Sequence, residues 1–174
     1  SISPPWLQGQ DSPHLKQVRL LTYNIFVRPP PVNNYGDDFK SERLIEFVKR
    51  FPDFDIICLQ EMFTKWSSRR EKLIKIAKQA GFKFTAESPL PAVFSTAMSD
   101  GGLLTLSRYP ILSTEFRPYP QGIGPDFIVW KGVLYTKIKV NRGIMHVFST
   151  HTQASYSTEI KYLLSHVEQL LCFR

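Results

Sequence analysis

The sequence predicts an α+β protein in which helices pack on the outside of β-sheets that pack on each other. Short apolar runs bounded by turn residues recur along the chain, amphipathic helical patterns interrupt them, and from Gly102 onward the pattern becomes that of strands. With 174 residues, of which 43% are hydrophobic and 21% charged, the chain can bury a core of ordinary globular composition.

The first half of the chain is predicted to alternate strands with helices. Residues 18–24 are expected to form a buried strand, and residues 28–38, which contain three successive prolines, a long loop. A wide apolar face predicts a helix at 41–51, which Pro52 would end. The apolar run at 55–60 predicts a second buried strand.

A second helix is expected to begin at Ser68, because Ser68 and Glu71 have the spacing of a capping box. Gly81 is well placed to end this helix. Residues 82–86 are a strand candidate, and residues 88–99, with two prolines, are expected to form a loop.

The second half of the chain predicts mainly strands, followed by one helix. The strands would span residues 102–106, 111–118, 132–140 and 144–150. Residues 141–143 have the composition of a tight hairpin turn, residues 121–130 are expected to form a loop, and Ser157 is expected to cap the final helix. The inward face of that helix would consist of Ile160, Leu163, Leu164, Val167, Leu170 and Leu171.

The chain is predicted to be one partial domain at 18–174, preceded by a loosely held polar tail at 1–17. No apolar run approaches the ~20 residues that a membrane span needs, and the N-terminus lacks the pattern of a signal peptide. Two cysteines, Cys58 and Cys172, do not make a disulfide framework, and Cys58 is expected to be a buried small hydrophobe. These observations leave the compartment open, with a soluble or peripheral membrane protein expected.

The net charge of +7 predicts an anionic partner, which could be nucleic acid, an acidic membrane surface or a phosphate substrate. The densest basic run alternates with apolar residues at helical spacing and is expected to be a solvated helix face. It consists of Lys65, Arg69, Arg70, Lys72, Lys75 and Lys78.

Three polar residues suited to metal or phosphate chemistry stand where predicted strands end. Glu61 follows a buried strand, where a carboxylate is costly unless it is paired or bound to a hard cation such as Mg²⁺. The Asn24 amide could bridge such a carboxylate and a substrate oxygen. His151 could stabilise charge on a phosphoryl oxygen or move a proton.

Each of these residues also has an ordinary structural alternative. Glu61 could form a salt bridge, Asn24 a turn, and His151 could be a packed, hydrogen-bonded histidine. Two weaker candidates stand beside glycines: Asp100 could orient a neighbouring histidine, and Lys131 could contact a phosphate.

In their order and context, these segments resemble the endonuclease/exonuclease/phosphatase superfamily, which includes deoxyribonucleases and neutral sphingomyelinases. The similarity runs over residues 18–154. The Asn24 and Glu61 motifs mark only the superfamily, whereas the strand after Lys131 and the segment 150–154 resemble the neutral, Mg²⁺-dependent sphingomyelinase branch. Other segments that resemble this branch are 23–26, 100–102, 107–111 and 124–126.

This resemblance implies roles for individual residues. Glu61 would bind Mg²⁺, with Mn²⁺ as the alternative ion, and Asn24 would help to hold the metal and the phosphate. His151 would contact the phosphoryl group and steady the transition state, and Asp100 would buttress His151. Asp126 and Lys131 match residues near the cleft of the branch, without a defined role.

The resemblance also implies a deoxyribonuclease I-like αββα sandwich, of which this chain would be the N-terminal half plus one helix. The superfamily continues with a Gly-Asp-x-Asn segment, a further aspartate and a terminal Ser-Asp-His, which have no counterpart here. Such a half would leave strand edges and an apolar face uncovered, so a missing C-terminal half or a partner chain is expected.

The complete enzyme would hydrolyse sphingomyelin or a related phospholipid to ceramide and phosphocholine at a membrane surface, where Trp6 and the Val93–Phe94 loop could enter the lipid. The chain alone is expected to have little turnover, because catalytic groups act as a unit. Two alternatives stay open: a nuclease that binds nucleic acid through its basic side chains, and an inactive fragment or binding module.

Overall fold

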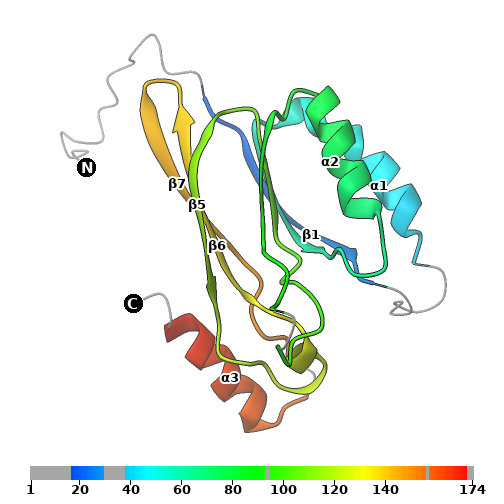
Figure 1. The fold of residues 1–174 in the computed structure, drawn as a ribbon, viewed down its shortest axis with the longest axis vertical. Coiled ribbons are helices and arrows are strands. Elements are labelled where there is room, and N and C mark those ends of the chain that lie inside the picture. The colour runs from blue at the N-terminus through cyan, green and yellow to red at the C-terminus, as the bar shows by residue number, and fades with distance from the viewer. Residues whose placement is uncertain (1–16, 30–37, 93–94, 156, 172–174) are drawn as a thin grey trace, which may run out of the picture.

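The computed structural model describes residues 17–29, 38–92, 95–155 and 157–171 and has three main layers (Figure 1). Helices α1 (Lys40–Val48) and α2 (Arg69–Gln79) cover one sheet, and a second sheet packs on the other side of it. Helix α3 (Ile160–Leu171) lies beyond one end of the second sheet. The predicted α+β sandwich is therefore confirmed.

The first sheet has the strand order β1-β2-β4-β3, in which β1 and β2 run parallel and the other pairs are antiparallel. Its strands are β1 (Leu20–Val27), β2 (Ile56–Met62), β3 (Phe84–Glu87) and β4 (Leu104–Ser107). Every residue of β2 is buried, because this strand is internal in the sheet and both of its faces are covered. Strand β2 is thus the rigid centre of the protein.

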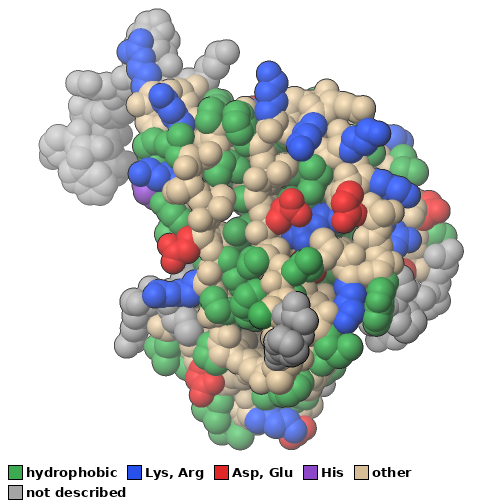
Figure 2. Space-filling model, in the orientation of Figure 1, with side chains coloured by type: hydrophobic (Ala, Val, Ile, Leu, Met, Phe, Trp, Pro, Cys, Tyr) green, Lys and Arg blue, Asp and Glu red, His purple; other side chains and the backbone are tan. Residues whose placement is uncertain are grey.

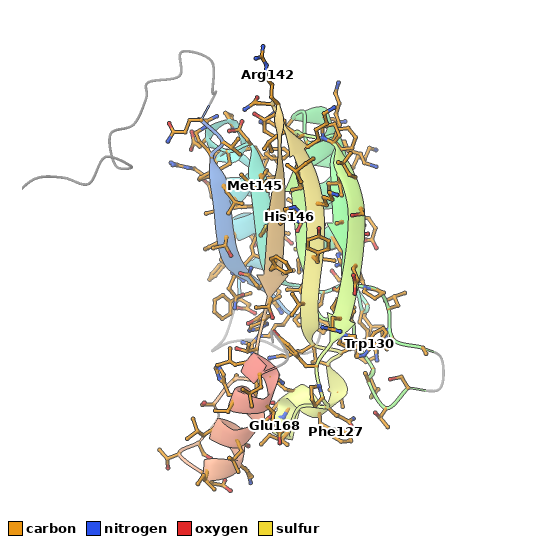
Figure 3. All side chains as sticks on the ribbon, turned by 90° about the vertical axis from the view of Figure 1, so that its left-hand side faces the viewer. Phe127, Trp130, Arg142, Met145, His146 and Glu168 are labelled. Carbon is orange, nitrogen blue, oxygen red and sulfur yellow. The ribbon has the colours of Figure 1, made fainter. Side chains whose placement is uncertain are left out.

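The second sheet is an antiparallel meander of β5 (Ile111–Pro118), β6 (Gly132–Val140) and β7 (Gly143–Thr150). The predicted hairpin turn joins β6 to β7, with Asn141 in the left-handed region at φ 47°. Cys58 of β2 is buried against Ile138 and Val147 of this sheet, as expected for a small hydrophobe. No described helix lies across the outer face, where Figure 3 labels His146.

Two strands extend further than the sequence predicts. Strand β1 continues past Asn24 to Val27, and β2 continues past Gln60 to Met62, so Asn24 and Glu61 lie within strands rather than at their ends. Strand β1 is also an edge strand with several exposed residues, not a buried one. Polar residues can occupy these positions because both strands kink there, which apolar periodicity does not reveal.

Two predictions about the second helix need correction. Helix α2 begins after Ser68, but the Ser68 side chain makes no capping hydrogen bond; the Ser67 hydroxyl accepts one from the Arg69 N–H instead. Arg70 belongs to the run predicted as a solvated face, yet it is 1% exposed. It is buried because Asp100 lies beneath α2 and accepts its hydrogen bond. Gly81 ends α2 as predicted, at φ 95°.

The orientation of α3 is opposite to the predicted one. Its six predicted inward residues are 42–71% exposed, while Ser165 and Gln169 are buried. The polar face turns inward because the chain after β7 presents polar groups: the Gln153 N–H donates to Gln169 at 2.6 Å. The outward apolar stripe fits the expectation that part of a sandwich would leave an apolar face uncovered.

The helix expected at 41–51 ends earlier, at Val48, and a separate short helical turn follows at Phe51–Asp53. Another short helical turn, Gly124–Ile128, lies within the segment expected to be a loop. Among the described helices, none is long and apolar enough to cross a bilayer. Several predictions fall outside the described residues: most of the N-terminal tail with Trp6, most of the proline-rich loop, Val93 and Phe94, and Cys172.

Because α3 turns its polar face inward, substitution of a polar residue should destabilise the protein more than substitution of an apolar one. Gln169→Ala should lower the free energy of unfolding by about 1–3 kcal/mol, because it leaves the buried Gln153 N–H without an acceptor. Leu164→Ala, at a side chain that is 55% exposed, should change it by about 0.5 kcal/mol or less. Urea denaturation measures both values; a larger effect at Leu164 would show that the apolar face packs inward.

Candidate active site

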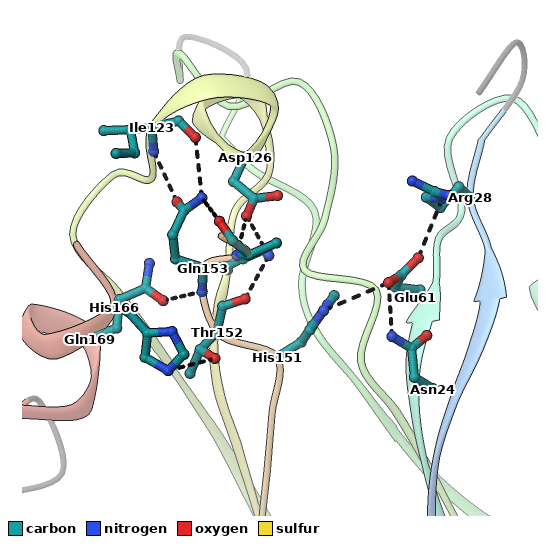
Figure 4. Close-up of polar contacts among 12 residues, drawn as sticks. Asn24, Arg28, Glu61, Ile123, Asp126, His151, Thr152, Gln153, His166 and Gln169 are labelled. Atoms are coloured by element: carbon teal, nitrogen blue, oxygen red, sulfur yellow. Dashed lines mark hydrogen bonds and ion pairs between the residues drawn. The ribbon is translucent and has the colours of Figure 1, made fainter. Parts of the chain in front are cut away.

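Glu61 is the centre of a polar cluster at one end of the sandwich (Figure 4). Its carboxylate accepts a hydrogen bond from the Asn24 amide at 2.8 Å, and its second oxygen lies 3.6 Å from the Arg28 guanidinium. That second oxygen is buried and has no hydrogen-bond partner in the described part of the chain. A buried, unsatisfied carboxylate oxygen is costly, which marks this atom as a ligand position.

Two residues with left-handed backbone conformations set the orientation of the side chains in this cluster. Phe26 of β1 has φ 52° and Glu61 of β2 has φ 57°, a conformation that costs a non-glycine residue roughly 1–2 kcal/mol. The Asn24 side chain accepts a hydrogen bond from the Phe26 N–H, so Asn24 holds its own kink and Glu61 together. Arg43 of α1 donates to the carbonyls of Ile25 and Phe26 and secures the kink from behind.

His151 follows β7 and points across the site toward Glu61, with its Nε2 3.7 Å from the carboxylate (Figure 4). Its Nδ1 is buried without a hydrogen-bond partner among the described residues. Burial lowers the pKa of His151 below its ordinary 6.5, and the charge of Lys131 lowers it further, while Glu61 and Asp126 oppose these effects. The imidazole is therefore neutral at pH 7, with one N–H to donate and one nitrogen to accept.

A buried ion pair holds the segment that carries His151. Lys131 donates to Asp126 at 2.7 Å and to the carbonyl of Thr152 at 2.7 Å, and Asp126 accepts from the N–H of Ala154 at 3.0 Å. Gln153 exchanges two hydrogen bonds with the backbone of Ile123. Residues 152–154 are thus fixed on both sides, which fixes the position of His151.

Asp100 does not occupy its predicted place beside His151. Its carboxylate is fully buried and binds Arg70, Thr64, Ser88 and the N–H of Gly102. The side chain lies on the α2 side of β2, where the buried Arg70 compensates its charge. The expectation that Asp100 buttresses His151 is therefore wrong in this structure.

A cavity of about 480 Å³ connects the polar cluster to the surface. Glu61, His151, Asp126 and Lys131 line it. Its mouth carries exposed apolar side chains, which are Phe26 (44% exposed), Trp66 (69%), Met98 (55%) and Ile128 (45%). Lys65 also lines the mouth and lies over the Trp66 ring. We call these five residues the rim. The cavity therefore joins a floor of paired charges and hydrogen-bonding groups to an amphipathic entrance.

The residues present fit a hard divalent cation. Glu61 offers a buried oxygen without a hydrogen-bond partner, and a carboxylate is the ligand that Mg²⁺ usually takes from proteins. In the described ranges no group of three or more His, Cys, Asp or Glu side chains gathers to hold an ion. Because Mg²⁺ keeps several waters and binds substrate phosphate, one protein carboxylate can be a sufficient starting point.

The two packed sheets with helices outside them define the fold class of the protein, a deoxyribonuclease I-like α+β sandwich. The family model for the endonuclease/exonuclease/phosphatase family matches residues 21–171. This chain therefore belongs to the endonuclease/exonuclease/phosphatase family.

Within this family, the chain is similar to sphingomyelinases. A sphingomyelinase from Dictyostelium discoideum is 41% identical over 135 residues, which are 72% of this chain and 29% of that protein. Sphingomyelinase C from Bacillus cereus is 28% identical over 151 residues, 80% of this chain and 44% of that enzyme. The chain thus spans less than half the length of these relatives.

A solved structure of a beta toxin variant from Staphylococcus aureus, with bound magnesium ions, has the same fold. The TM-score is 0.73 at 22% identity, over 89% of this chain and 57% of the toxin chain. The TM-score agrees with the predicted sandwich fold. The 57% coverage of the toxin chain agrees with the prediction that this chain corresponds to only part of such a sandwich.

Sequence reasoning placed Asn24, Glu61 and His151 together correctly, but it missed Arg28 and Gln153. Arg28 follows β1 directly, four residues after Asn24, and this spacing of a cation near an expected metal ligand was its only signal. Gln153 was part of a recognised segment, but its role depends on contacts with Ile123 and Gln169 that are distant in sequence.

The electrostatics of the site predict opposite effects of two substitutions on the pKa of His151. Lys131→Met should raise it, because a nearby positive charge is lost, and Glu61→Gln should lower it further. NMR titration of the imidazole in metal-free buffer measures both. Shifts in the same direction would contradict this arrangement of charges.

The same pKa fixes the sign of a pH effect on stability. Because the folded pKa lies below 6.5, the unfolded chain takes up the proton first as the pH falls. The contribution of His151 to the free energy of unfolding is therefore complete above pH 6.5 and decreases below it, until the folded pKa is reached.

Proposed function

We propose that this chain forms part of the catalytic domain of a metal-dependent phosphodiesterase that hydrolyses sphingomyelin, or a related phospholipid, to ceramide and phosphocholine. One observation carries the proposal: the Glu61 oxygen without a hydrogen-bond partner and the His151 imidazole line the same cavity. The sphingomyelinase relatives support the choice of substrate.

Glu61 would hold Mg²⁺, and Asn24 would keep the carboxylate in place through its 2.8 Å hydrogen bond. When bound, the cation supplies positive charge that polarises a phosphoryl oxygen and stabilises the leaving alkoxide. The neutral His151 would donate a hydrogen bond to a phosphoryl oxygen. The Asp126–Lys131 pair would position His151 by holding the backbone at Thr152 and Ala154, and the predicted phosphate contact of Lys131 remains a proposal.

The rim favours a lipid substrate over nucleic acid. Aromatic and aliphatic side chains at a cavity mouth, flanked by lysine, suit the interface of a bilayer, where amphipathic side chains bury their apolar parts and keep charges in water. On the face shown in Figure 2, Lys and Arg side chains are scattered among acidic ones, which is unlike the continuous basic surface that tracks a nucleic-acid backbone.

The remaining groups of the active site would come from sequence that this chain does not contain. The general base and the residues that position the attacking water have no counterpart here by the family resemblance, and the chain spans only 29–44% of the relatives. The outward apolar stripe of α3 is a surface that the rest of such a domain would cover. The 174 residues alone should therefore have little or no turnover.

Substitution of the proposed metal ligand tests the function. With the rest of such a domain present, Glu61→Gln should reduce Mg²⁺-dependent phosphocholine release from sphingomyelin vesicles by at least about 100-fold. Glu115→Gln, at an exposed carboxylate of β5, is the matched control and should leave the rate unchanged. Plasmid nicking measured in parallel would assign a nuclease if it alone is lost in Glu61→Gln.

The rim predicts a second effect, on membrane binding rather than chemistry. Trp66→Ala should weaken sedimentation with sphingomyelin vesicles by about 5- to 30-fold, the effect of one buried aromatic anchor. Phe148→Ala removes an aromatic side chain that is 61% exposed on the outer face of the second sheet, and it should not change vesicle binding. Equal losses in both variants would contradict a role of the rim.

A further inference from the structure

Glu61 adopts a backbone conformation that its own sequence does not favour. It lies within β2 at φ 57°, and a glutamate gains nothing from the left-handed region that glycine or asparagine occupies more easily. A strained residue persists only where its surroundings hold it. The contacts around the Glu61 kink should therefore reveal what fixes the direction of its carboxylate.

The backbone of Gly102 lies directly against this kink. The Met62 N–H donates to the carbonyl of Gly102 at 2.8 Å. A methyl group added at Gly102 would lie 3.1 Å from the Cα of Glu61 and 2.9 Å from the Phe63 ring. Gly102 itself is left-handed, at φ 66°. Only glycine can bring the two backbones this close.

The buried carboxylate of Asp100 joins the two segments that meet at the kink. One oxygen accepts from the N–H of Gly102 at 3.1 Å, and the other accepts from the N–H and the hydroxyl of Thr64, at 3.2 and 3.1 Å. Thr64 follows Glu61 by three residues, while Gly102 packs on it. A single side chain thus ties the strand beyond Glu61 to the loop that supports it.

Arg70 anchors this carboxylate to helix α2. It donates to Asp100 at 2.7 Å and to the carbonyl of Leu103 at 2.6 Å, and both charged side chains are 2% exposed or less. A buried carboxylate without a cation would be strongly unfavourable, so Arg70 is what allows Asp100 to be charged in this place. The chain of contacts therefore runs from α2, through Asp100 and Gly102, to Glu61.

We propose that Asp100, Arg70 and Gly102 are positioning residues that fix the left-handed backbone of Glu61 and so aim its carboxylate into the cavity. None of them lines that cavity, and they act on Glu61 only through the backbone. The part of the proposal that concerns metal affinity rests on the proposed function. The part that concerns the backbone of Glu61 does not.

A pair of identical substitutions separates this role from a general effect on the fold. Gly102→Ala places a methyl group against Glu61, whereas Gly81→Ala, at φ 95°, places one against only the guanidinium of Arg108. Both substitutions force alanine into the left-handed region and should lower the melting temperature. Only Gly102→Ala should disturb the Glu61 kink.

Two measurements on the 174-residue chain test the expectation. In metal-free protein, amide hydrogen exchange at Met62 should become at least tenfold faster in Gly102→Ala and remain unchanged in Gly81→Ala. Calorimetric titration with Mg²⁺ should show affinity reduced about 10- to 100-fold in Gly102→Ala alone, the effect of disturbing the support of a ligand. Unchanged Met62 exchange in Gly102→Ala would overturn the proposal, whether or not the parent protein binds Mg²⁺.

Asp100→Asn tests the contribution of the Asp100–Arg70 ion pair to the position of Glu61. It keeps the size of the side chain but removes the buried negative charge beside Arg70, which keeps only its ion pair with the partly exposed Glu87 at 3.2 Å. It should accelerate exchange at Met62 and Thr64 and weaken Mg²⁺ binding. Leu73→Ala, in the buried face of α2, is the control because it destabilises the same helix without touching Asp100. If Leu73→Ala produced the same local changes as Asp100→Asn, the pair would be merely structural and the proposal would be wrong.

Discussion

The site depends on one constraint, which is that a carboxylate must be kept in a buried position with one oxygen unsatisfied. Glu61 is on a strand whose residues are all buried, and Asn24 satisfies only one of its oxygens. Water would relieve the cost of such an arrangement, and so would repacking of the strand. The layers on both sides of β2 prevent repacking, so the free energy of the core maintains a group that is poised for a ligand.

The helices behind the first sheet contribute to the site as well as to the core. An arginine from each of them supports a kinked strand. Arg43 of α1 binds the backbone of β1 at Ile25 and Phe26, and Arg70 of α2 acts on β2 indirectly, by binding Asp100 in the loop that packs on it. Both strands of the β1–β2 pair therefore bend at neighbouring positions, and each bend is secured from the side opposite the cavity. This explains why polar groups stand inside strands without disrupting the sheet.

The sequence predicts well those helices and strands whose limits follow from the local pattern of apolar and turn residues. The limits of β5 and β6, the β6–β7 hairpin and the end of α2 at Gly81 were all predicted closely. Prediction failed where a long-range polar contact decides the outcome. Arg70 has the spacing of a surface residue and is buried because of Asp100, thirty positions away. Helix α3 has a clear apolar stripe, but hydrogen bonds from 152–153 turn its polar face inward.

Helix α3 also shows why the two halves of the site differ in how they are held. The Glu61 half is enclosed by helices and sheets and is supported through a buried ion pair. The His151 half has its own buried ion pair, Lys131 with Asp126, but it also depends on hydrogen bonds to a short helical turn and to α3, whose apolar residues face outward. A segment that docked on that apolar stripe would shift α3. Through the hydrogen bond between Gln169 and Gln153, it would also shift the loop that carries His151. The position of the histidine would then respond to the rest of the protein, while that of the carboxylate would not.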